Sequence, residues 1–377
     1  METLLRIAIV GCGKIGCAHA SQIVKLKRCE IVGVCNRSPL KAKQFCERFR
    51  AKRYFTDLAE LVDKTRPDVV HITTSAESHF DVAEFCLDQG CHVYVEKPFT
   101  LTAQEAQRLV DLANIRGVKL TVGHNNQFSN VARRMRALVE KGYLGGPPVH
   151  LDAYYSYDLG DVTYAGALLD DKNHWVRRLP GKLLHNVISH GIARIAEFLT
   201  TDAPQVIARG FVSSCLKELN ENEVVDELRV IITEEERRTA YFTFSSQMRP
   251  SIHELRIYGP TNGLILDQNH EILTKLRGRK FRSYADIFIP PVLLAKQYCG
   301  NLVTNARLFL GRDLHKYSGM EYLISSFYRS IRQATPVPIP YQEILRTAKI
   351  MDAIFEQLGT SQWNNATVSL SARTPVG

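Results

Sequence analysis

The sequence predicts an α/β protein built from a doubly wound parallel sheet and a second, mostly antiparallel sheet. Three observations lead to this fold class. The first 122 residues alternate short Val- and Ile-rich runs with helical patterns, as parallel strands covered on both faces do. A glycine-rich turn follows the first of these runs. After residue 124, longer stretches alternate apolar and polar residues, which indicates antiparallel strands with one buried face.

The strands expected in the first part are short, apolar and separated by helix-like segments. "LKAKQFCERFR" and "FDVAEFCLDQG" are two such segments, and the second ends at Gly90, which suits a helix C-terminus. We predict strands at Leu5–Val10, Glu30–Cys35, Lys52–Phe55, Asp68–Thr73, His92–Val95 and Val118–Val122. In a sheet of this kind, ligands bind beyond the carboxyl ends of the strands.

The second part begins with a basic helix, Asn130 to Glu140, and a Gly-Gly-Pro-Pro break. Alternating stretches such as "VHLDAYYSYD" and "IHELRIYGPTNGLILD" follow, and helices at Tyr322–Ala334 and Tyr341–Leu358 close the chain. We therefore predict a dinucleotide-binding domain at 1–124 and a substrate-binding and oligomerisation domain at 125–377. Residues 272–317 are apolar, basic and broken by proline, and we interpret them as an insertion or lid. A subunit contact or a membrane-surface contact are the alternatives.

Composition narrows the function. The chain has 377 residues and a formal net charge of +9, without an aromatic-basic recognition module, so we expect no nucleic-acid partner. No apolar run is long enough to span a bilayer and no signal peptide opens the chain, which predicts a cytoplasmic protein without a transmembrane segment. The nine cysteines form no CxxC pair and no zinc-type cluster, so we expect no metal.

The turn "IAIVGCGKIGCAHA" has the G-x-G-x-x-G spacing, directly after a strand and at the start of a helix. The first glycine allows the tight turn, the second lets a pyrophosphate approach the backbone, and the third allows close packing of helix and strand. This context predicts dinucleotide binding. The expected contacts are Gly11, Gly13, Lys14, Ile15 and Gly16.

The end of the second strand bears on the choice of cofactor. An acidic residue there usually holds the ribose hydroxyls, but this chain has Asn36, Arg37 and Ser38. A carboxylate repels a 2′-phosphate, whereas Asn36 and Arg37 tolerate or attract one, which favours NADP over NAD. Arg37 stacking on adenine, or facing solvent, is the alternative. Thr74 and Ser75, at the end of the fourth strand, are further expected cofactor contacts, and His79 either contacts the cofactor or packs at the helix start.

Three motifs together resemble a known family. The strand at 92–95 leads into Glu96-Lys97-Pro98, "VGHNNQF" follows the sixth strand, and the glycine turn opens the chain. This set resembles the Gfo/Idh/MocA oxidoreductases, the family of glucose-fructose oxidoreductase and inositol dehydrogenase. The likeness covers nearly the whole chain and is weakest at 272–317. It implies a Rossmann domain and a second domain whose open sheet packs subunits into homodimers or homotetramers. It also implies that Glu96 and Lys97 lie near the nicotinamide.

The same resemblance assigns the reaction centre. In "GKLLHNVISHGIARIAEFL", His190 matches the family's histidine and Asn186 stands where an aspartate is usual. The implied roles are polarisation of the substrate by Lys97, acid/base catalysis by His190 and binding of the reacting hydroxyl by Asn186. Asn186 cannot accept a proton, so a different substrate or slower turnover is expected. His185 either orients the site or binds a hydroxyl.

Other residues concern the substrate. Asn126 and Gln127 stand where the family often has arginines, which favours a neutral, hydroxyl-rich substrate. Trp175 is expected to stack on a sugar ring, and Arg177 or Arg178 to meet a phosphate. A surface loop with one packed tryptophan is the alternative for this segment.

The predicted function is an NAD(P)-dependent oxidoreductase that moves a hydride between the nicotinamide and a secondary hydroxyl of a sugar, cyclitol or sugar derivative. Two alternatives remain open at this point. One is a glycosidase-like or epimerising enzyme that recycles its cofactor within each turnover, and the other is a non-catalytic dinucleotide-binding sensor. The predicted oxidoreductase produces net reduction of the nicotinamide, whereas neither the internally recycling enzyme nor the sensor does.

Overall fold

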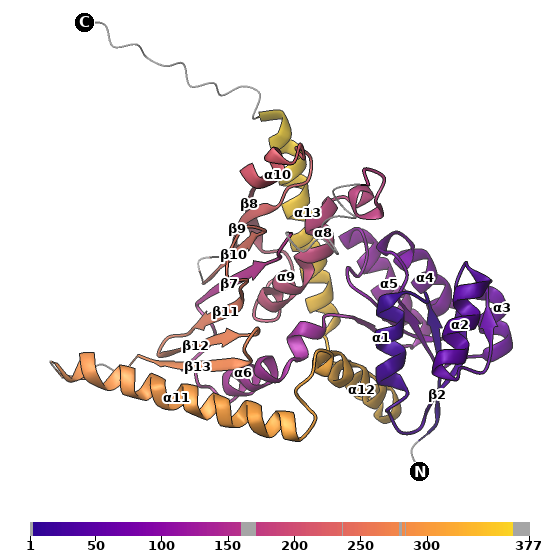
Figure 1. Cartoon of the computed structure of the whole chain (residues 1–377), viewed down its shortest axis with the longest axis horizontal. Coiled ribbons are helices and arrows are strands. Elements are labelled where there is room, and N and C mark those ends of the chain that lie inside the picture. Colours follow the sequence, from indigo (N-terminus) through magenta and orange to yellow (C-terminus); the bar gives the residue numbers. More distant parts are fainter. Residues whose placement is uncertain (1–2, 160–170, 236, 279–280, 283, 365–377) are drawn as a thin grey trace, which may run out of the picture.

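The computed structural model describes residues 3–159, 171–235, 237–278, 281–282 and 284–364. Two sheets lie side by side in the molecule, each with its own apolar core (Figure 1). The predicted fold class is confirmed, because the first sheet is parallel and the second is mostly antiparallel.

The first sheet has six strands in the order β3-β2-β1-β4-β5-β6, all paired in parallel. The order reverses direction between β1 and β4, which creates a crevice beyond the carboxyl ends of these two strands. The strands are β1 (Leu5–Val10), β2 (Cys29–Cys35), β3 (Tyr54–Phe55), β4 (Val69–Ile72), β5 (His92–Val95) and β6 (Leu120–Val122). Each end of each strand lies at most two residues from its predicted position.

Five helices connect these strands: α1 (Lys14–Ile23), α2 (Pro39–Phe49), α3 (Leu58–Thr65), α4 (His79–Asp88) and α5 (Ala103–Arg116). A short 3₁₀ turn, η1 (Ala76–Ser78), precedes α4. Side-chain oxygens of Ser38, Asp57 and Thr102 accept hydrogen bonds from the backbone three residues on, so the starts of α2, α3 and α5 are encoded locally. Gly117 ends α5 in the left-handed conformation.

The second sheet has the order β13-β12-β11-β7-β10-β9-β8, and its only parallel pair within the described residues is β7 with β10. One face carries apolar residues at alternate positions, such as Val230 and Ile232 of β9 and Phe242 and Phe244 of β10. The strands are β7 (His150–Ser156), β8 (Gln205–Phe211), β9 (Glu227–Glu234), β10 (Arg238–Ser245), β11 (His253–Tyr258), β12 (Asn262–Asp267) and β13 (Ile272–Arg277).

Helices pack against the apolar face of this sheet (Figure 1). They include α6 (Asn130–Glu140), α8 (Lys182–Val187), α9 (Ser189–Ala196) and α13 (Tyr341–Asn364). Shorter elements are η2 (Asn125–Phe128), η3 (Trp175–Arg178) and α10 (Ser214–Glu218). The turn η2 directly follows β6, so "VGHNNQF" lies where the first sheet passes into the second half of the chain.

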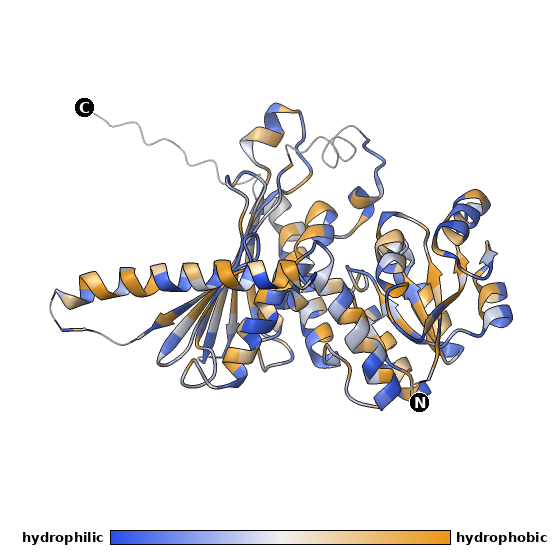
Figure 2. Ribbon diagram, turned by 60° about the horizontal axis from the view of Figure 1, so that its bottom comes forward, coloured by the Kyte–Doolittle hydropathy of each residue, from blue (hydrophilic) through white to orange (hydrophobic). Residues whose placement is uncertain are grey.

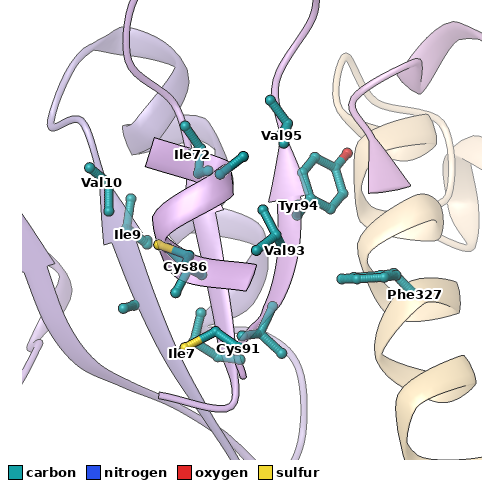
Figure 3. Packing of buried hydrophobic residues seen from close by; sticks show 14 of the residues in the cluster. Ile7, Ile9, Val10, Ile72, Cys86, Cys91, Val93, Tyr94, Val95 and Phe327 are labelled. Atoms are coloured by element: carbon teal, nitrogen blue, oxygen red, sulfur yellow. The ribbon is translucent and has the colours of Figure 1, made fainter. Parts of the chain in front are cut away.

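Helix α12 (Ser318–Gln333) returns to the first sheet, although it follows the second sheet in sequence. Figure 3 shows Phe327 of α12 beside Tyr94 of β5, and the two rings meet edge to face at 6.1 Å between centroids. The first core is therefore completed by residues more than 200 positions away in the chain.

Helix α11 (Ala285–Leu310) occupies most of the predicted insertion and runs along the β13 edge of the second sheet (Figure 2). Its N-terminal end projects beyond the strands (Figure 1). None of the helices in the described part of the chain combines the length and apolar character needed to cross a membrane.

Candidate active site

The glycine turn joins β1 to α1 with three glycines in different environments. Gly11 has φ of 102°, and a Cβ there would lie 2.7 Å from the backbone of Thr73. A Cβ on Gly16 would lie 2.2 Å from the carbonyl oxygen of Gly11. A Cβ on Gly13 would meet nothing within 4 Å, so this backbone borders open space at the start of α1. That arrangement fits a pyrophosphate on the helix N-terminus.

The end of β2 is tied to this turn. Asn36 accepts a hydrogen bond from the backbone N–H of Cys12 at 3.1 Å through its Oδ1 atom. Ser38 caps α2, whereas Arg37 is exposed. Asn36 thus supports the shape of the glycine turn, and Arg37 is the residue of this group whose side chain is open to solvent.

At the end of β4, the hydroxyl of Thr73 donates to the carbonyl oxygen of Gly11 at 2.7 Å. Ser78 donates to the hydroxyl of Thr74 at 2.8 Å, while Thr74 and Ser75 are half-buried. His79 is buried, and its Nδ1 lies 2.8 Å from the carbonyl oxygen of Pro98. The imidazole of His79 therefore connects the ends of β4 and β5, and burial lowers its pKa.

Glu96 is the end of a buried chain of hydrogen bonds. Its Oε1 atom lies 2.8 Å from Nε2 of His19, whose Nδ1 lies 2.8 Å from Nδ1 of His71. The Nε2 atom of His71 lies 2.7 Å from the hydroxyl of Tyr328 on α12. One arrangement of protons satisfies every member: Tyr328 donates to His71, His71 to His19, and His19 to the carboxylate of Glu96.

Electrostatics agree with a charged Glu96 and a neutral His71. Burial acts to raise the pKa of Glu96, but the hydrogen bond with His19 and the positive charge of Lys97 outweigh it, and the pKa is lowered. Burial, followed by the nearby His19, lowers the pKa of His71 well below its usual value. The Oε2 atom of Glu96 also accepts from the backbone N–H of Lys97 at 3.1 Å. Glu96 therefore fixes the backbone from which the Lys97 side chain departs.

Lys97 joins the two halves of the site. The Lys97–Pro98 peptide bond is cis. The ammonium of Lys97 donates to the backbone carbonyl of Asn186 at 2.7 Å and to its Oδ1 atom at 3.3 Å. Burial lowers the pKa of Lys97, and the carboxylate of Glu96 opposes that shift. Lys97, which follows β5 of the first sheet, thus contacts α8 at Asn186. His190, four residues after Asn186, lies on the next helix, α9.

His190 begins α9 and meets His124, from the end of β6, with ring centroids 6.1 Å apart and nearly edge to face. Burial is the largest cause that lowers the pKa of His190 well below its usual value, and the charge of Lys97 adds to it. Burial also lowers the pKa of His124 to about 4. The Nδ1 atoms of both rings are buried and have no hydrogen-bond partner among the described residues. Two neutral imidazoles with unused nitrogens therefore lie together near an ammonium.

A cleft of about 490 Å³ opens on one side of His190. Its lining comes from the glycine turn (Ile15), from η2, from the turns around β12 and from the segment that precedes α12. The polar side chains that line it are Asn125, Asn126, Ser129, His190, Gln268, Glu271, His315, Lys316 and Ser318. A crevice that starts at the glycine turn and ends among amides and hydroxyls suits a nicotinamide next to a polyhydroxylated molecule.

A smaller cavity of about 30 Å³ is lined by residues 98–102, which precede α5, and by α8, α9 and α13. His185 and Ser189 line it together with His124. The Nε2 atom of His185 lies 3.3 Å from the carbonyl oxygen of Thr100, and its ring stacks on Phe355. Burial lowers the pKa of His185 to about 4. His185 thus lines this smaller cavity, and it does not line the described cleft.

Two other predicted substrate contacts have protein partners. The amide of Gln127 donates to the carboxylate of Glu343 at 2.6 Å and to the carbonyl oxygen of Ala193 at 3.1 Å, so the side chain faces the interior between α9 and α13. Trp175 opens η3 beside His174, with ring centroids 5.8 Å apart. Neither residue lines the described cleft.

The two arginines after Trp175 are paired. Arg177 forms an ion pair with Glu221 at 2.6 Å, and Arg178 forms one with Glu77 at 2.7 Å. The segment that precedes them, 160–170, lies outside the described residues. In the described structure, both guanidinium groups are therefore held by carboxylates of the protein.

The sequence did not point to several residues of the cleft. Gln268 and Glu271 follow β12 and reach the cleft only because the second sheet brings that turn next to η2. Arg194 of α9 is buried and donates to the backbone oxygen of Asn126 at 3.3 Å and to Gln268. His124 is the one of these residues that the sequence could have indicated, because it belongs to the "VGHNNQF" motif.

Residues 5–124 match the model of a family described as "Oxidoreductase family, NAD-binding Rossmann fold". Residues 5–124 thus belong to the Gfo/Idh/MocA oxidoreductase family. The resemblance of the three motifs is thereby confirmed. Curated relatives of this chain include UDP-N-acetylglucosamine 3-dehydrogenase of Acidithiobacillus ferrooxidans, 30% identical over 40% of this chain and 44% of the relative. D-glucoside 3-dehydrogenase of Escherichia coli is 29% identical over 37% of this chain and 40% of the relative. The alignments thus span less than half of either relative.

Solved structures resemble almost the whole chain at low identity. An NAD binding oxidoreductase from Klebsiella pneumoniae has a TM-score of 0.75 and 19% identity, covering 95% of this chain and 97% of the other. The WlbA dehydrogenase from Bordetella pertussis, solved with NADH and UDP-GlcNAcA, has a TM-score of 0.73 and 16% identity, with 96% and 97% covered. At these identities the likeness establishes the fold of both halves of this protein.

Proposed function

We propose that the chain is an NAD(P)-dependent oxidoreductase that transfers a hydride between the nicotinamide and a secondary hydroxyl of a sugar, cyclitol or sugar derivative. The observation that supports the proposal is the contact between Lys97 and Asn186, together with the effect of the Lys97 charge on the neutral imidazole of His190, which lines the cleft. The nicotinamide supplies the hydride acceptor or donor when it is bound.

Each residue has a defined part in alcohol oxidation. His190, neutral because burial lowers its pKa, accepts the hydroxyl proton of the substrate. Lys97 stabilises the alkoxide-like charge that develops on the same oxygen. Asn186 holds the ammonium of Lys97 through its backbone and side-chain oxygens, and so positions the cation instead of sharing a proton. In the reverse direction, the protonated His190 returns the proton to the carbonyl oxygen.

The cleft supports a hydroxyl-rich substrate. Asn125, Asn126 and Gln268 bring amide groups to the cleft. The Oδ1 atom of Asn125 accepts from Tyr94 and the Oε1 atom of Gln268 from Arg194, so these two amides offer their NH2 groups as donors to sugar hydroxyls. The relatives named for glucoside, inositol and UDP-N-acetylglucosamine dehydrogenation act on molecules of this kind. Lys316 in the lining adds positive charge that suits a substrate carrying an anionic substituent.

For the cofactor, we propose NADP over NAD. Arg37 is exposed at the end of β2, and no carboxylate occupies the position of Asn36, so a 2′-phosphate meets a cation there and no repelling charge. Titration of the protein with each oxidised dinucleotide, followed by the same titration of Arg37→Ala, tests this. A wild-type preference for NAD, or a preference that Arg37→Ala leaves unchanged, contradicts the assignment.

The activity is tested with oxidised dinucleotide and a panel of sugars, cyclitols and nucleotide sugars, by following the absorbance of reduced nicotinamide. Turnover is expected with at least one member of the panel, and Lys97→Met is expected to lower kcat by about a hundredfold or more while dinucleotide binding persists. Failure to bind either dinucleotide overturns the proposal. Binding without net reduction in any reaction points to internal recycling of the cofactor or to a sensor.

A further inference from the structure

Helix α11 is attached to the molecule by its polar side. The side-chain amide of Gln297 accepts from the backbone N–H of Lys275 at 2.7 Å and donates to its carbonyl at 3.1 Å. One turn later, Asn301 makes the same pair of bonds with the backbone of Leu273, at 3.1 and 3.0 Å. Asn305 donates to the carbonyl of His270 at 2.9 Å. Three amides spaced four residues apart thus cover the open edge of β13.

The apolar side of α11 faces outward. Of residues Ala285–Leu310, which the structure describes without a gap, the buried one is the polar Asn301. Ten large apolar side chains of residues 284–310 are between 36% and 81% exposed, whereas Ile289, Leu293 and Leu308 are half-buried, and Figure 2 shows orange stretches along the helix. The ten exposed side chains are Tyr284, Ile287, Phe288, Val292, Leu294, Tyr298, Leu302, Val303, Phe309 and Leu310.

This distribution is the reverse of the usual one for a helix on a globular protein, whose apolar stripe faces the core. An exposed apolar surface of this length marks a site that another surface covers. Two kinds of surface have the required apolar character: a second copy of this chain, or the boundary between lipid headgroups and acyl chains.

The charge around α11 decides between a second copy of the chain and a lipid surface. Residues 275–316 contain nine lysines and arginines and two aspartates, so this segment carries seven of the nine net positive charges of the chain. The cations cluster at both ends of the helix, for example Arg277 and Arg282 before it, Arg307 in its last turn and Arg312 after it. Two copies paired through α11 would bring these like charges together, whereas an anionic bilayer attracts them.

We propose that α11 docks this protein on an anionic phospholipid surface, with the helix in the plane of the interface. The apolar side chains enter the outer part of the acyl region, and the flanking arginines and lysines meet lipid phosphates. Tyr284, Phe288, Tyr298 and Phe309 place aromatic rings along the same side, where amphipathic rings suit the headgroup level. Asn301 and Gln297 keep the helix on β13, so docking leaves the rest of the chain outside the lipid.

The docked face adjoins the cleft. The segment that leaves α11 runs directly into Leu314–Met320, and every residue of that stretch lines the cleft. Lys316 thus belongs both to the basic segment and to the rim of the cleft. Docking would therefore present the mouth of the cleft close to the membrane. This inference goes beyond the proposed oxidoreductase function, and its test requires no turnover.

The test is cosedimentation of the full chain with sucrose-loaded vesicles. One set contains phosphatidylcholine alone, and the other contains phosphatidylcholine with about one third phosphatidylglycerol, a composition that supplies anionic phosphate. We expect binding to the anionic set, weaker binding to the neutral set, and a loss of binding as salt rises, because the cations are screened.

Substitutions separate the two contributions. The triple variant Ile287→Ser, Phe288→Ser, Val292→Ser is expected to weaken binding at least about tenfold, since three apolar side chains no longer enter the lipid. Arg307→Gln and Arg312→Gln are each expected to weaken binding to anionic vesicles about fivefold. The matched control replaces Ile207, Phe211 and Leu219 by Ser; these are 60%, 52% and 61% exposed on other elements and should leave vesicle binding unchanged.

Three results would overturn the proposal. The first is no binding to either vesicle set, and the second is binding that the α11 triple variant retains in full. The third comes from sedimentation velocity without lipid: a wild-type oligomer that the triple variant converts to a monomer identifies a second copy as the occupant. Circular dichroism and dinucleotide binding of each variant establish that the fold is retained, so that a loss of vesicle binding reports on α11 itself.

Discussion

Two groups of buried histidines adjoin the Glu96–Lys97 pair, and they differ in their hydrogen bonds. His19 and His71 use both ring nitrogens, in a chain that runs from Tyr328 to Glu96. His124 and His190 each keep a buried Nδ1 without a partner among the described residues. Burial alone does not distinguish a structural imidazole from a reactive one. The difference lies in whether the protein itself satisfies the ring.

The adjacent residues Glu96 and Lys97 act on different groups of these histidines. Glu96 faces the partnered pair and ends its chain of donors, while Lys97 bonds to Asn186 and its charge lowers the pKa of His190. Adjacent residues at a strand end point to opposite sides, so a dipeptide can anchor a core with one side chain and supply a reactive cation with the other. The four predictions below test this division, from the largest expected effect to the smallest.

Replacing His190 by Asn should lower kcat about 10² to 10⁴-fold, because the group that accepts the substrate proton is lost. Steady-state kinetics with the best substrate of the panel measures it. Dinucleotide affinity and the urea midpoint should stay close to wild type, since the ring has no protein partner at Nδ1 to lose. If the variant keeps its activity, His190 has a structural role and does not accept the substrate proton.

Replacing His19 by Leu should act on stability instead. The carboxylate of Glu96 would stay buried without its imidazole donor, which costs about 3 to 5 kcal/mol. Urea unfolding measures the loss. The double variant His19→Leu, Glu96→Gln should recover part of it, because the buried charge is gone. Equal losses in the single and double variants would mean that the pair is not coupled.

The pH dependence of stability tests the two histidines that line the smaller cavity. His124 and His185 have pKa values lowered to about 4, against about 6.5 in an unfolded chain. Below pH 6.5 the unfolded state binds protons that the folded state does not, so stability falls as pH drops from 6.5 toward 4. At pH 5 the loss is about 2 kcal/mol for each residue.

Thermal unfolding between pH 7.5 and 4.5 measures this decline. His124→Gln and His185→Gln should each flatten it, whereas His270→Gln, at a 71% exposed side chain, serves as the control. A melting temperature that does not change between pH 6.5 and 5 would contradict the burial of these rings in neutral form.

The smallest effect is expected for Tyr328→Phe. The change removes the outermost donor of the partnered chain and leaves one ring nitrogen of His71 unpaired, which costs about 1 kcal/mol. A fall of a few degrees in Tm, with kcat unchanged, is expected in a differential scanning measurement. A fall in kcat without a change in Tm would link the hydrogen-bond chain from Tyr328 to Glu96 to catalysis. The distinction between the two groups of histidines would then be lost.

Much of the fold followed from local patterns. The strand Leu5–Val10 and the helix Asn130–Glu140 have the predicted bounds, because their apolar spacing and their flanking turn residues lie in the same short segment. The Glu-Lys-Pro stretch and His190 were found by resemblance, and the structure brings them to one place through the contact of Lys97 with Asn186. Their roles remain predictions until the variants are measured.

What could not be predicted depends on long-range contacts. His19 and His71 are 52 positions apart and Tyr328 is 257 positions from His71, so no local pattern announces their hydrogen bonds. Gln127 belongs to a motif that pointed to the substrate, yet its amide is bound by Glu343 from α13. Helix α11 was expected as a lid or insertion, but periodicity alone does not reveal which side of a helix meets the protein.

The hydrogen bond between Tyr328 and His71 has a consequence for biosynthesis. The first sheet is complete in sequence by residue 122, but its row of buried hydrogen bonds ends on α12, and its apolar core is completed by α12 and by later residues such as Ile339 and Ile344. A nascent chain must therefore carry an unfinished N-terminal domain through the synthesis of some 200 further residues. A ribosome-released fragment that ends before Ser318 should aggregate or recruit chaperones, and α12 supplied as a separate peptide should rescue it.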